Sequence, residues 1–401
     1  MQPPQISDNV WWVGVRDRDL RIFDIIMATQ HGTTYNAYLV KGTERVALID
    51  TVKAAFTEEY FANIAAVVPL DRVNLLVVNH TEPDHSGAMH ALLDRLPNLE
   101  IVCATAALPF VKNVLNREAK ITPVKDNSEI DLGGKRLIFK LTPYMHWPDT
   151  MMEFLAEDGI LFSCDGFAAH IAFDDLWADQ SAVDFDSEMH YYYDAIMRPF
   201  APYIRKNLPK LADFAIRMIA PSHGPLIRRD VAAHLDKYRR WSADKTEGKN
   251  QVAIVYVSSY GNTARIAGAV EANLRGRGYT TVMVNAADCR PGDLRDTLEA
   301  SRAVAFGTPT FAGDAVRPTW DAVNLLSTVP TRGLKAAVFG SYGWGGEGVK
   351  LVQQRLEGMK IKTLDEIFKA RLVPSSEDMA SLDEWVGKFA ALIEEKAAGG
   401  E

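Results

Sequence analysis

Four side chains of metal-binding type lie close together directly after a run of apolar residues. The segment NHTEPDHSG (residues 79–87) holds His80, Glu82, Asp84 and His85 within six residues, behind the apolar segment 75–78. Packing carboxylates and imidazoles together costs desolvation free energy unless water or a cation balances their charge. In an extended turn, the pattern H-x-E-x-D-H aims its first two ligands one way and its last two the other. It therefore favours a site for two adjacent metal ions over a polar loop of hydrogen-bonded histidines.

Three more candidate ligands follow apolar segments in the first half of the chain. These are His146, Asp165 and His223. The apolar segments before them are typical of strands and span residues 136–141, 159–163 and 214–220. Strand ends of a layered α/β fold bring residues from distant parts of the sequence to one rim. We therefore expect these three side chains at the same rim as the cluster that follows the strand 75–78.

Composition limits the classes of protein to which such a site can belong. The 401 residues suggest two domains, and the net charge of −8 disfavours a nucleic-acid partner. None of the three cysteines belongs to a C-x-x-C pair, so we expect a reducing, cytoplasmic setting and no fused rubredoxin domain. The first five residues lack the pattern of an export signal, and no apolar run approaches a membrane span. We expect a cytoplasmic protein without a membrane partner.

A change in character after about residue 230 predicts a second domain. An amphipathic helix at 234–241 precedes the polar stretch 242–250, which has the composition of a linker. The apolar strand 251–257 then leads into a hydroxyl-rich turn and a helical pattern over 264–274. Such a turn and helix N-terminus aim backbone N–H groups at an anion, and neither a P-loop nor a dinucleotide motif is present. We predict domains at 1–248 and 249–401, the second with a phosphate-binding turn.

Two further loops fall at the same edge of the predicted parallel sheet. They follow the strands 303–307 and 336–340, at the position where doubly wound folds bind ligands. The candidate cofactor-binding residues of the three loops are Ser258, Ser259, Tyr260, Gly261, Asn262, Thr263, Thr308, Pro309, Thr310, Phe311, Ala312, Gly313, Ser341, Tyr342, Gly343, Trp344, Gly345 and Gly346.

Both halves of the chain resemble one known family. The ligand motifs NHTEPDHSG, HWPDT, FSCDGF and APSHGP resemble the metallo-β-lactamase fold in the form used by flavodiiron proteins. The turn S-x-Y-G-N-T resembles the flavodoxin loop that holds the phosphate of FMN. The resemblance covers nearly the whole chain and implies an N-terminal metallo-β-lactamase-like αββα sandwich followed by a C-terminal flavodoxin-like doubly wound parallel sheet. Hydrolases of this fold usually carry H-x-H-x-D-H; Glu82 in place of the second histidine favours iron over zinc.

The resemblance also implies a role for each candidate ligand. One iron would be bound by His80, Glu82 and His146, the other by Asp84, His85 and His223, and Asp165 would bridge them. In the second domain FMN would be the cofactor, with an aromatic residue against its isoalloxazine ring. Trp344 is the candidate for that contact, unless it merely covers the sheet edge.

The implied activity is the reduction of dioxygen to water, of nitric oxide to nitrous oxide, or both. The implied electron donor is external, either rubredoxin or a reduced deazaflavin coenzyme, and the implied assembly is a head-to-tail homodimer or a homotetramer. Two alternatives come from other classes of protein. A dizinc hydrolase with a flavin-binding domain would need no reductant, and a metal-free electron-transfer module would be expected to lose several of the ligands. The sequence does not choose between the two gases, the two donors or the two assemblies.

Several residues near the expected site have two interpretations. Tyr192 and Tyr193 either contribute a phenol to the substrate pocket or pack in the core. His170 is interpreted as a residue that orients a ligand. Asp24 stands where some family members carry a histidine near the irons, which leaves substrate preference open. The other histidines are expected at the surface or the core edge: His31, His90, His190 and His234.

Overall fold

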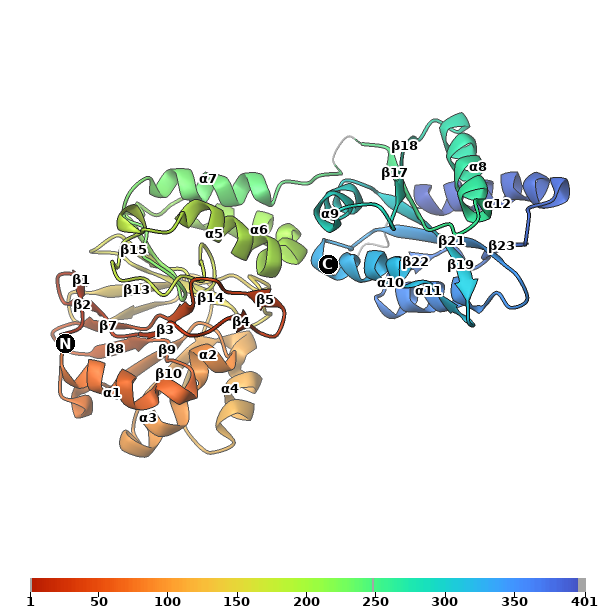
Figure 1. The fold of residues 1–401 in the computed structure, drawn as a ribbon. Helices are drawn as coiled ribbons and strands as arrows, with labels where there is room; N and C mark the ends of the chain where they lie inside the picture. Colours follow the sequence, from red (N-terminus) through yellow and green to blue (C-terminus); the bar gives the residue numbers. More distant parts are fainter. Residues whose placement is uncertain (1, 247–248, 396–401) are drawn as a thin grey trace. The chain divides into compact units, whose positions relative to one another are not determined.

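The computed structural model describes residues 2–246 and 249–395 (Figure 1). They form two compact units, residues 1–243 and 244–401. The boundary predicted from the sequence falls a few residues later, and residues 247–248, next to that boundary, lie outside the described part. Within the described ranges, no helix is both long and apolar enough to cross a lipid bilayer.

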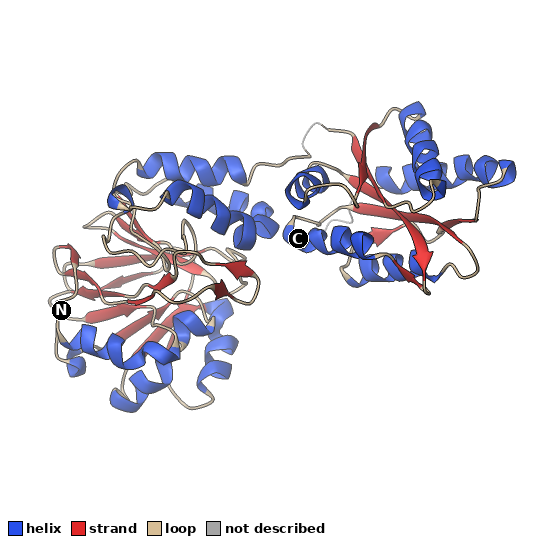
Figure 2. Cartoon of the chain, in the orientation of Figure 1, coloured by secondary structure: helices blue, strands red, loops and turns tan. Residues whose placement is uncertain are grey.

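The first unit is an αββα sandwich, which confirms the predicted fold class (Figures 1 and 2). One sheet has the order β1 (Gln5–Ser7), β2 (Val10–Trp12), β7 (Tyr38–Lys41), β8 (Val46–Ile49), β9 (Leu75–Val78), β10 (Glu100–Ala104), β11 (Lys120–Val124). The other has the order β12 (Glu129–Asp131), β13 (Arg136–Leu141), β14 (Met151–Leu155), β15 (Ile160–Phe162), β16 (Met218–Ala220). Two small ribbons pair β3 (Val15–Asp17) with β6 (Thr33–Tyr35) and β4 (Ile22–Phe23) with β5 (Met27–Ala28).

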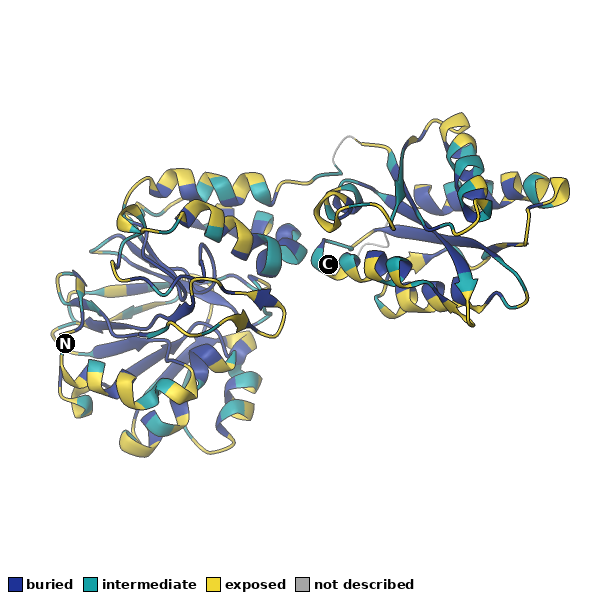
Figure 3. Cartoon of the chain, in the orientation of Figure 1, coloured by how far each residue is buried: buried dark blue, intermediate teal, exposed yellow. Residues whose placement is uncertain are grey.

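Helices cover the outer faces of both sheets of this unit (Figure 1). The first sheet is covered by α1 (Thr57–Ala65), α2 (Pro83–Ser86), α3 (Met89–Arg95) and α4 (Leu108–Leu115). The second is covered by α5 (Phe185–Tyr192), which continues into a π-helical turn at Tyr193–Met197, by α6 (Ala201–Asn207) and by α7 (Val231–Trp241). Strands such as β9, with the sequence LLVV, are apolar throughout because they are buried on both faces (Figure 3).

The prediction of a strand over residues 214–220 is wrong for residues 214–217. Only Met218–Ala220 is a strand, because Phe214 and Ile216 donate their backbone N–H groups to carbonyls two or three residues earlier and so form a turn. Phe214 instead stacks on Phe154, with ring centroids 4.3 Å apart. An apolar run does not distinguish a turn that covers a sheet from a strand within it.

The second unit is a doubly wound sheet of the flavodoxin type. Its strand order is β18 (Thr280–Asn285), β17 (Gln251–Tyr256), β19 (Ala303–Phe311), β21 (Lys335–Tyr342), β22 (Lys362–Thr363); β20 (Asp314–Ala315) pairs with β19, and β23 (Phe368–Arg371) with β21. Two helices pack on one face, α8 (Asn262–Gly276) and α12 (Ser376–Glu394). Three pack on the other: α9 (Pro291–Glu299), α10 (Arg317–Asn324) and α11 (Glu347–Gly358). Each face has its own apolar core.

Two of the predicted cofactor loops start later than predicted. Thr308 and Pro309 still pair in parallel with Gly340 and Ser341, so Thr308–Phe311 belongs to β19 and Ser341–Tyr342 to β21. The strands continue beyond their apolar residues because backbone hydrogen bonding, unlike burial, does not depend on the side chain. The backbones also approach closely here, since a Cβ on Gly340 would lie 2.1 Å from the Thr308 carbonyl oxygen.

Candidate functional site

The seven candidate metal ligands come from five segments of the first unit, and all lie at one rim of the sandwich. His80 and Glu82 follow β9, Asp84 and His85 lie in α2, His146 lies between β13 and β14, Asp165 follows β15, and His223 follows β16. The cluster is therefore not the extended turn that was predicted, because its second half is a helical turn. Gly87 closes this turn, and a Cβ there would lie 2.5 Å from the Ala54 nitrogen.

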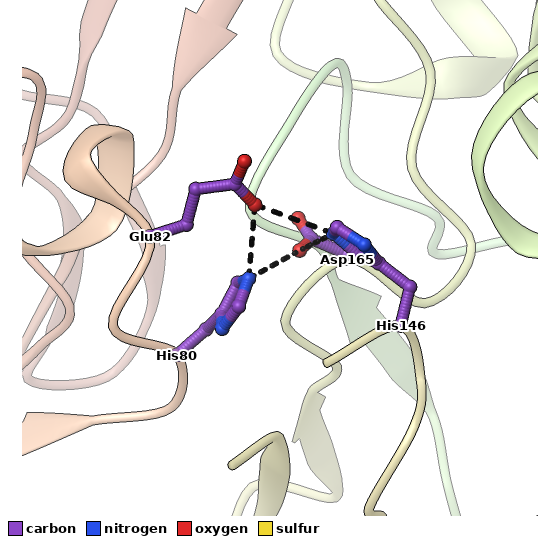
Figure 4. A group of neighbouring side chains, drawn as sticks. All are labelled: His80, Glu82, His146 and Asp165. Atoms are coloured by element: carbon purple, nitrogen blue, oxygen red, sulfur yellow. Dashed lines mark hydrogen bonds and ion pairs between the residues drawn. The ribbon is translucent and has the colours of Figure 1, made fainter. Parts of the chain in front are cut away.

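Four of these side chains form a first ligand group (Figure 4). Nε2 of His80 lies 3.0 Å from Glu82 Oε2 and 3.8 Å from Asp165 Oδ2. Nε2 of His146 lies 3.4 Å from the same Glu82 oxygen and 3.2 Å from the same Asp165 oxygen. Ligand atoms bound about 2.1 Å from one ion are roughly 3 Å from each other, so the spacing of this group suits a single metal ion.

A second ligand group lies on the other side of Asp165. Nε2 of His85 lies 3.4 Å from Asp84 Oδ1 and 3.3 Å from Asp165 Oδ1. Nε2 of His223 lies 3.2 Å from Asp84 Oδ2 and 3.4 Å from Asp165 Oδ1. One oxygen of Asp165 thus faces each group, which is the geometry of a carboxylate that bridges two ions.

The polar atoms of the two groups have the chemistry that a metal pair requires. Both carboxylate oxygens of Asp84 and of Asp165, and Nε2 of His85, are buried and have no hydrogen-bond partner among the described residues. Buried polar atoms are otherwise almost always hydrogen-bonded. Together the groups present carboxylate oxygens and imidazole nitrogens, a donor set that suits iron and related divalent ions. The residues present therefore fit a pair of metal ions.

Opposite charges hold the cluster together electrostatically. Burial would lower the pKa of His146 and of His223, but the close Asp165 carboxylate and a second carboxylate beside each imidazole raise each pKa to about 9. Burial would likewise raise the pKa of Asp165, yet the surrounding imidazoles hold it well below its usual range. Protons on the imidazoles thus balance the carboxylates of the cluster when no metal does.

Two imidazoles have a hydrogen-bond partner on their far nitrogen, and a third faces a carboxylate there at ion-pair distance. His80 Nδ1 lies 3.2 Å from Asp149 Oδ1, and His223 Nδ1 donates to the Thr34 carbonyl at 2.6 Å. His85 Nδ1 lies 3.8 Å from Asp50 Oδ2. Partners of this kind fix the tautomer and leave Nε2 for the metal.

No role at the site was predicted from the sequence for Asp50, Asp149 or Thr34. One feature of the sequence could have indicated a role for Asp50: its carboxylate directly follows a buried strand, and the ligand motifs also follow strands. Its φ of +56°, like the +50° of Cys164, places it in a backbone region that non-glycine residues rarely adopt. Strained residues of this kind concentrate at functional sites.

A small pocket of about 140 Å³ adjoins both ligand groups. Glu82 and Asp84, one ligand from each group, form its floor, and Asp24 and Lys53 also line it. Burial and the neighbouring Glu82 carboxylate raise the pKa of Asp24 to about 7. Phe23 and Tyr35 form an apolar part of the pocket wall. The pocket therefore admits a small molecule beside the two ligand groups.

The two candidate tyrosines lie in different surroundings. Tyr192 is buried, with its ring centroid 5.0 Å from that of His170 and 6.2 Å from that of His223. Tyr193 is turned the other way and packs against Tyr238 and Trp241, at 5.4 Å and 5.3 Å. The structure brings only Tyr192 to the cluster.

His170 lies directly beside the second ligand group. Its ring centroid is 5.1 Å from that of His223 and 4.2 Å from that of Phe23. Its Nδ1 is 2.8 Å from the hydroxyl of Thr33, whose neighbour Thr34 binds His223. His170 thus supports the His223 side of the cluster from outside the two groups.

The candidate cofactor residues of the second unit gather at the carboxyl ends of its strands. Ser258–Gly261 join β17 to the N-terminus of α8, and Gly261 has a φ of +83° that favours glycine. The hydroxyl oxygens of Ser258 and Thr310 are buried without a hydrogen-bond partner in the described part of the chain. Large aromatic side chains remain exposed at the same edge, namely Tyr260, Phe311 and, with 87% of its surface accessible, Trp344. The edge offers polar groups for a phosphate and aromatic surface for a planar ring.

Family models match both units of the chain. A model described as ODP family beta lactamase matches residues 33–224, and the flavodoxin model matches residues 254–385. The chain is 38% identical to the type A flavoprotein fprA of Rhodobacter capsulatus, over 94% of this chain and 88% of that protein. It is 36% identical to the flavo-diiron protein FprA2 of Clostridium acetobutylicum (97% and 99%) and 32% identical to a nitric oxide reductase of Moorella thermoacetica (98% and 99%).

A solved structure agrees with these relatives. The rubredoxin oxygen:oxidoreductase of Desulfovibrio gigas matches with a TM-score of 0.69 and 28% identity, covering 99% of this chain and all of that one. The sequence relatives are similar over nearly their whole length, and the order of the two units is the same. The predicted family is therefore confirmed, and the chain belongs to the flavodiiron proteins, also called type A flavoproteins.

Proposed function

We propose that this chain binds two iron ions at the rim of its first unit and FMN at the edge of its second. We propose further that it reduces dioxygen to water, nitric oxide to nitrous oxide, or both. The observation that carries the proposal is the position of Asp165, whose two oxygens face two separate pairs of imidazoles. A ferrous pair supplies electrons to a small bound molecule, and FMN can replace them one or two at a time.

The residues of the chain would divide the work as follows. His80, Glu82 and His146 would hold one ion, and Asp84, His85 and His223 the other, while Asp165 bridges. Asp149, Asp50 and Thr34 would keep the imidazoles oriented. The pocket of about 140 Å³ beside Glu82 and Asp84 is large enough to admit a diatomic gas.

The relatives support both gases as substrates. The Moorella thermoacetica relative is named a nitric oxide reductase, and the Desulfovibrio gigas structure a rubredoxin oxygen:oxidoreductase. Both names describe reductions, which disfavours the dizinc hydrolase considered from the sequence. We therefore keep dioxygen and nitric oxide together as proposed substrates of this chain, with rubredoxin or a reduced deazaflavin coenzyme as the external donor.

A head-to-tail homodimer, or a homotetramer built from it, is part of the proposal. Each unit exposes large apolar side chains beside its candidate site: Ile25 and Ile26 in the first, and Phe311 and Trp344 in the second. An assembly that covers these exposed side chains would remove their apolar surface from water. Sedimentation should give a dimer or tetramer, whereas a fully active monomer would exclude this assembly.

One experiment tests the proposed function directly. Purified protein is assayed for iron, zinc and flavin, reduced anaerobically, and then exposed separately to dioxygen and to nitric oxide. The expected result is about two irons for each FMN, with rapid flavin reoxidation by at least one gas. The variant His223→Ala should retain flavin but lose turnover. Bound zinc together with flavin that stays reduced in both gases would overturn the proposal.

A further inference from the structure

Glu153 is a carboxyl group in the core of the first unit, away from the two ligand groups. It lies in β14 with no exposed surface, between the cross-strand neighbours Phe139 and Phe162. Its single hydrogen bond comes from Asn79, whose Nδ2 donates to Oε1 at 3.2 Å. Its other oxygen, Oε2, is buried without a partner, and no ion pair among the described residues includes Glu153. A carboxylate in such surroundings would lack any compensating cation.

A chain of contacts leads from Glu153 to the second ligand group. The backbone N–H of Asn79 donates to Asp50 Oδ1 at 2.7 Å. The other oxygen of Asp50 lies 3.8 Å from Nδ1 of His85, whose Nε2 faces Asp84 and Asp165. Two residues, Asn79 and Asp50, therefore connect this buried acid to a candidate metal ligand.

The two buried carboxyl groups on this path differ in the partners that surround them. Asp50 accepts the backbone N–H of Asn79 and the Ser222 hydroxyl at 3.5 Å, and it faces an imidazole. Glu153 has one amide donor, and burial followed by repulsion from Asp50 raises its pKa well above its usual range. Tyr38 also interacts electrostatically with Glu153, and its hydroxyl donates to the Pro221 carbonyl at 2.6 Å. Asp50 therefore has more partners for a negative charge than Glu153 has.

We propose that Glu153 is a neutral carboxylic acid that anchors Asn79 and, through Asn79 and Asp50, holds the His85 imidazole toward the second metal ion. Glu153 is thus a positioning residue that never touches metal or substrate. The inference rests on the ligand assignment proposed above and deepens it, because it names a residue that controls how firmly the second ion is kept.

The test compares Glu153→Gln, Glu153→Ala and the control Leu155→Ala. Gln is neutral and keeps an oxygen for Asn79, whereas Ala removes the anchor. Leu155 is fully buried two residues along the same strand, so its truncation opens a cavity on the same face without touching the path. The metal-loaded proteins are dialysed against graded chelator, and the metal retained per chain is measured, with circular dichroism as the check on folding. An infrared spectrum at neutral pH records protonated carboxylic acids.

Glu153→Ala should release one of its two ions at about tenfold lower chelator, a typical effect of losing a group that orients a ligand. Glu153→Gln should restore retention, and Leu155→Ala should lose thermal stability without early release. The carboxylic-acid band of Glu153 should be present in the wild-type protein and absent from Glu153→Gln. Identical infrared spectra, or equal retention by Glu153→Ala and the wild type, would overturn the inference. Both readouts are independent of gas reduction, so failure of the proposed activity would be seen separately.

Discussion

Metal binding to this protein should release protons, at least one for each ion. His146 in the first ligand group and His223 in the second each have a pKa of about 9 in the metal-free protein. Both are therefore protonated at pH 7, and an imidazolium has no lone pair to offer a metal. Each ion must displace a proton before it can bind.

The magnitude follows from the distance between pH 7 and the raised pKa. Two units correspond to about 2.7 kcal/mol for each imidazole, or about 100-fold in the affinity for one ion. For each proton released, the apparent metal affinity should therefore rise about tenfold per pH unit up to pH 9, and then level off. The stability of the metal-free fold depends on pH with the opposite sign. A histidine with a raised pKa contributes its full stabilisation below about pH 6.5, the ordinary pKa of histidine, and this stability is lost as the pH rises through 9.

The assay is calorimetric titration of metal-free protein with Co²⁺ in buffers of different ionisation enthalpy. The dependence of the measured heat on the buffer gives the protons released, and repetition at pH 7, 8 and 9 gives the slope of affinity. The control is His190→Gln, since His190 is half exposed and lies outside both ligand groups. Affinity that does not change between pH 7 and 9, or release of fewer than about one proton per ion at pH 7, would refute the reasoning.

Three further predictions concern residues around the sites. Asp149→Ala should weaken metal binding about tenfold or more, because His80 loses the carboxylate that orients it, and chelator competition measures this. Asp24→Asn should raise the melting temperature of metal-free protein more at pH 8 than at pH 5. A carboxyl whose pKa is raised in the folded state destabilises the fold only at pH values where the unfolded chain is ionised, and this cost grows until the folded carboxyl ionises as well. The double variant of Ser258 and Thr310 to Ala should weaken FMN binding about tenfold, measured by flavin fluorescence, through loss of two hydroxyl partners.

Each of these predictions has an outcome that contradicts it. Metal retention unchanged in Asp149→Ala would show that the His80 imidazole is held by packing alone. A gain in the Asp24→Asn melting temperature that is equal at both pH values would mean that the carboxyl does not titrate between them. An unchanged dissociation constant for FMN would place the flavin away from the Ser258 and Thr310 hydroxyls.

The ligand cluster could be anticipated from the sequence because its local signals are strong. His80 directly follows a short strand of Leu and Val, and Asp165 and His223 follow strands in the same way, so topology alone brings them to one rim. The groups that orient the imidazoles could not be anticipated. Thr34 is 189 positions from His223 in the chain, and its contribution is a backbone carbonyl that every residue carries.

The full length of strands β19 and β21 could not be predicted from the sequence either. Thr308–Phe311 and Ser341–Tyr342 are polar or mixed, and only their pairing with neighbouring strands makes them sheet. Phe214 shows the reverse case, in which an apolar residue packs on a sheet without joining it. Burial pattern and hydrogen-bond pairing are separate properties, and a single sequence reports mainly the first.

The electrostatic balance of the cluster bears on how the protein folds. Burying Glu82, Asp84 and Asp165 together would strongly oppose folding if they were unpaired. Protons on the surrounding imidazoles supply the opposite charge, in keeping with the raised pKa values of His146 and His223. The rim can therefore form before metal arrives, with each proton occupying the electrostatic role that an ion later takes. Metal loading is then an exchange of protons for ions in a rim that already exists. For His146 and His223, the pH dependence of metal affinity and the pH dependence of metal-free stability therefore have opposite signs.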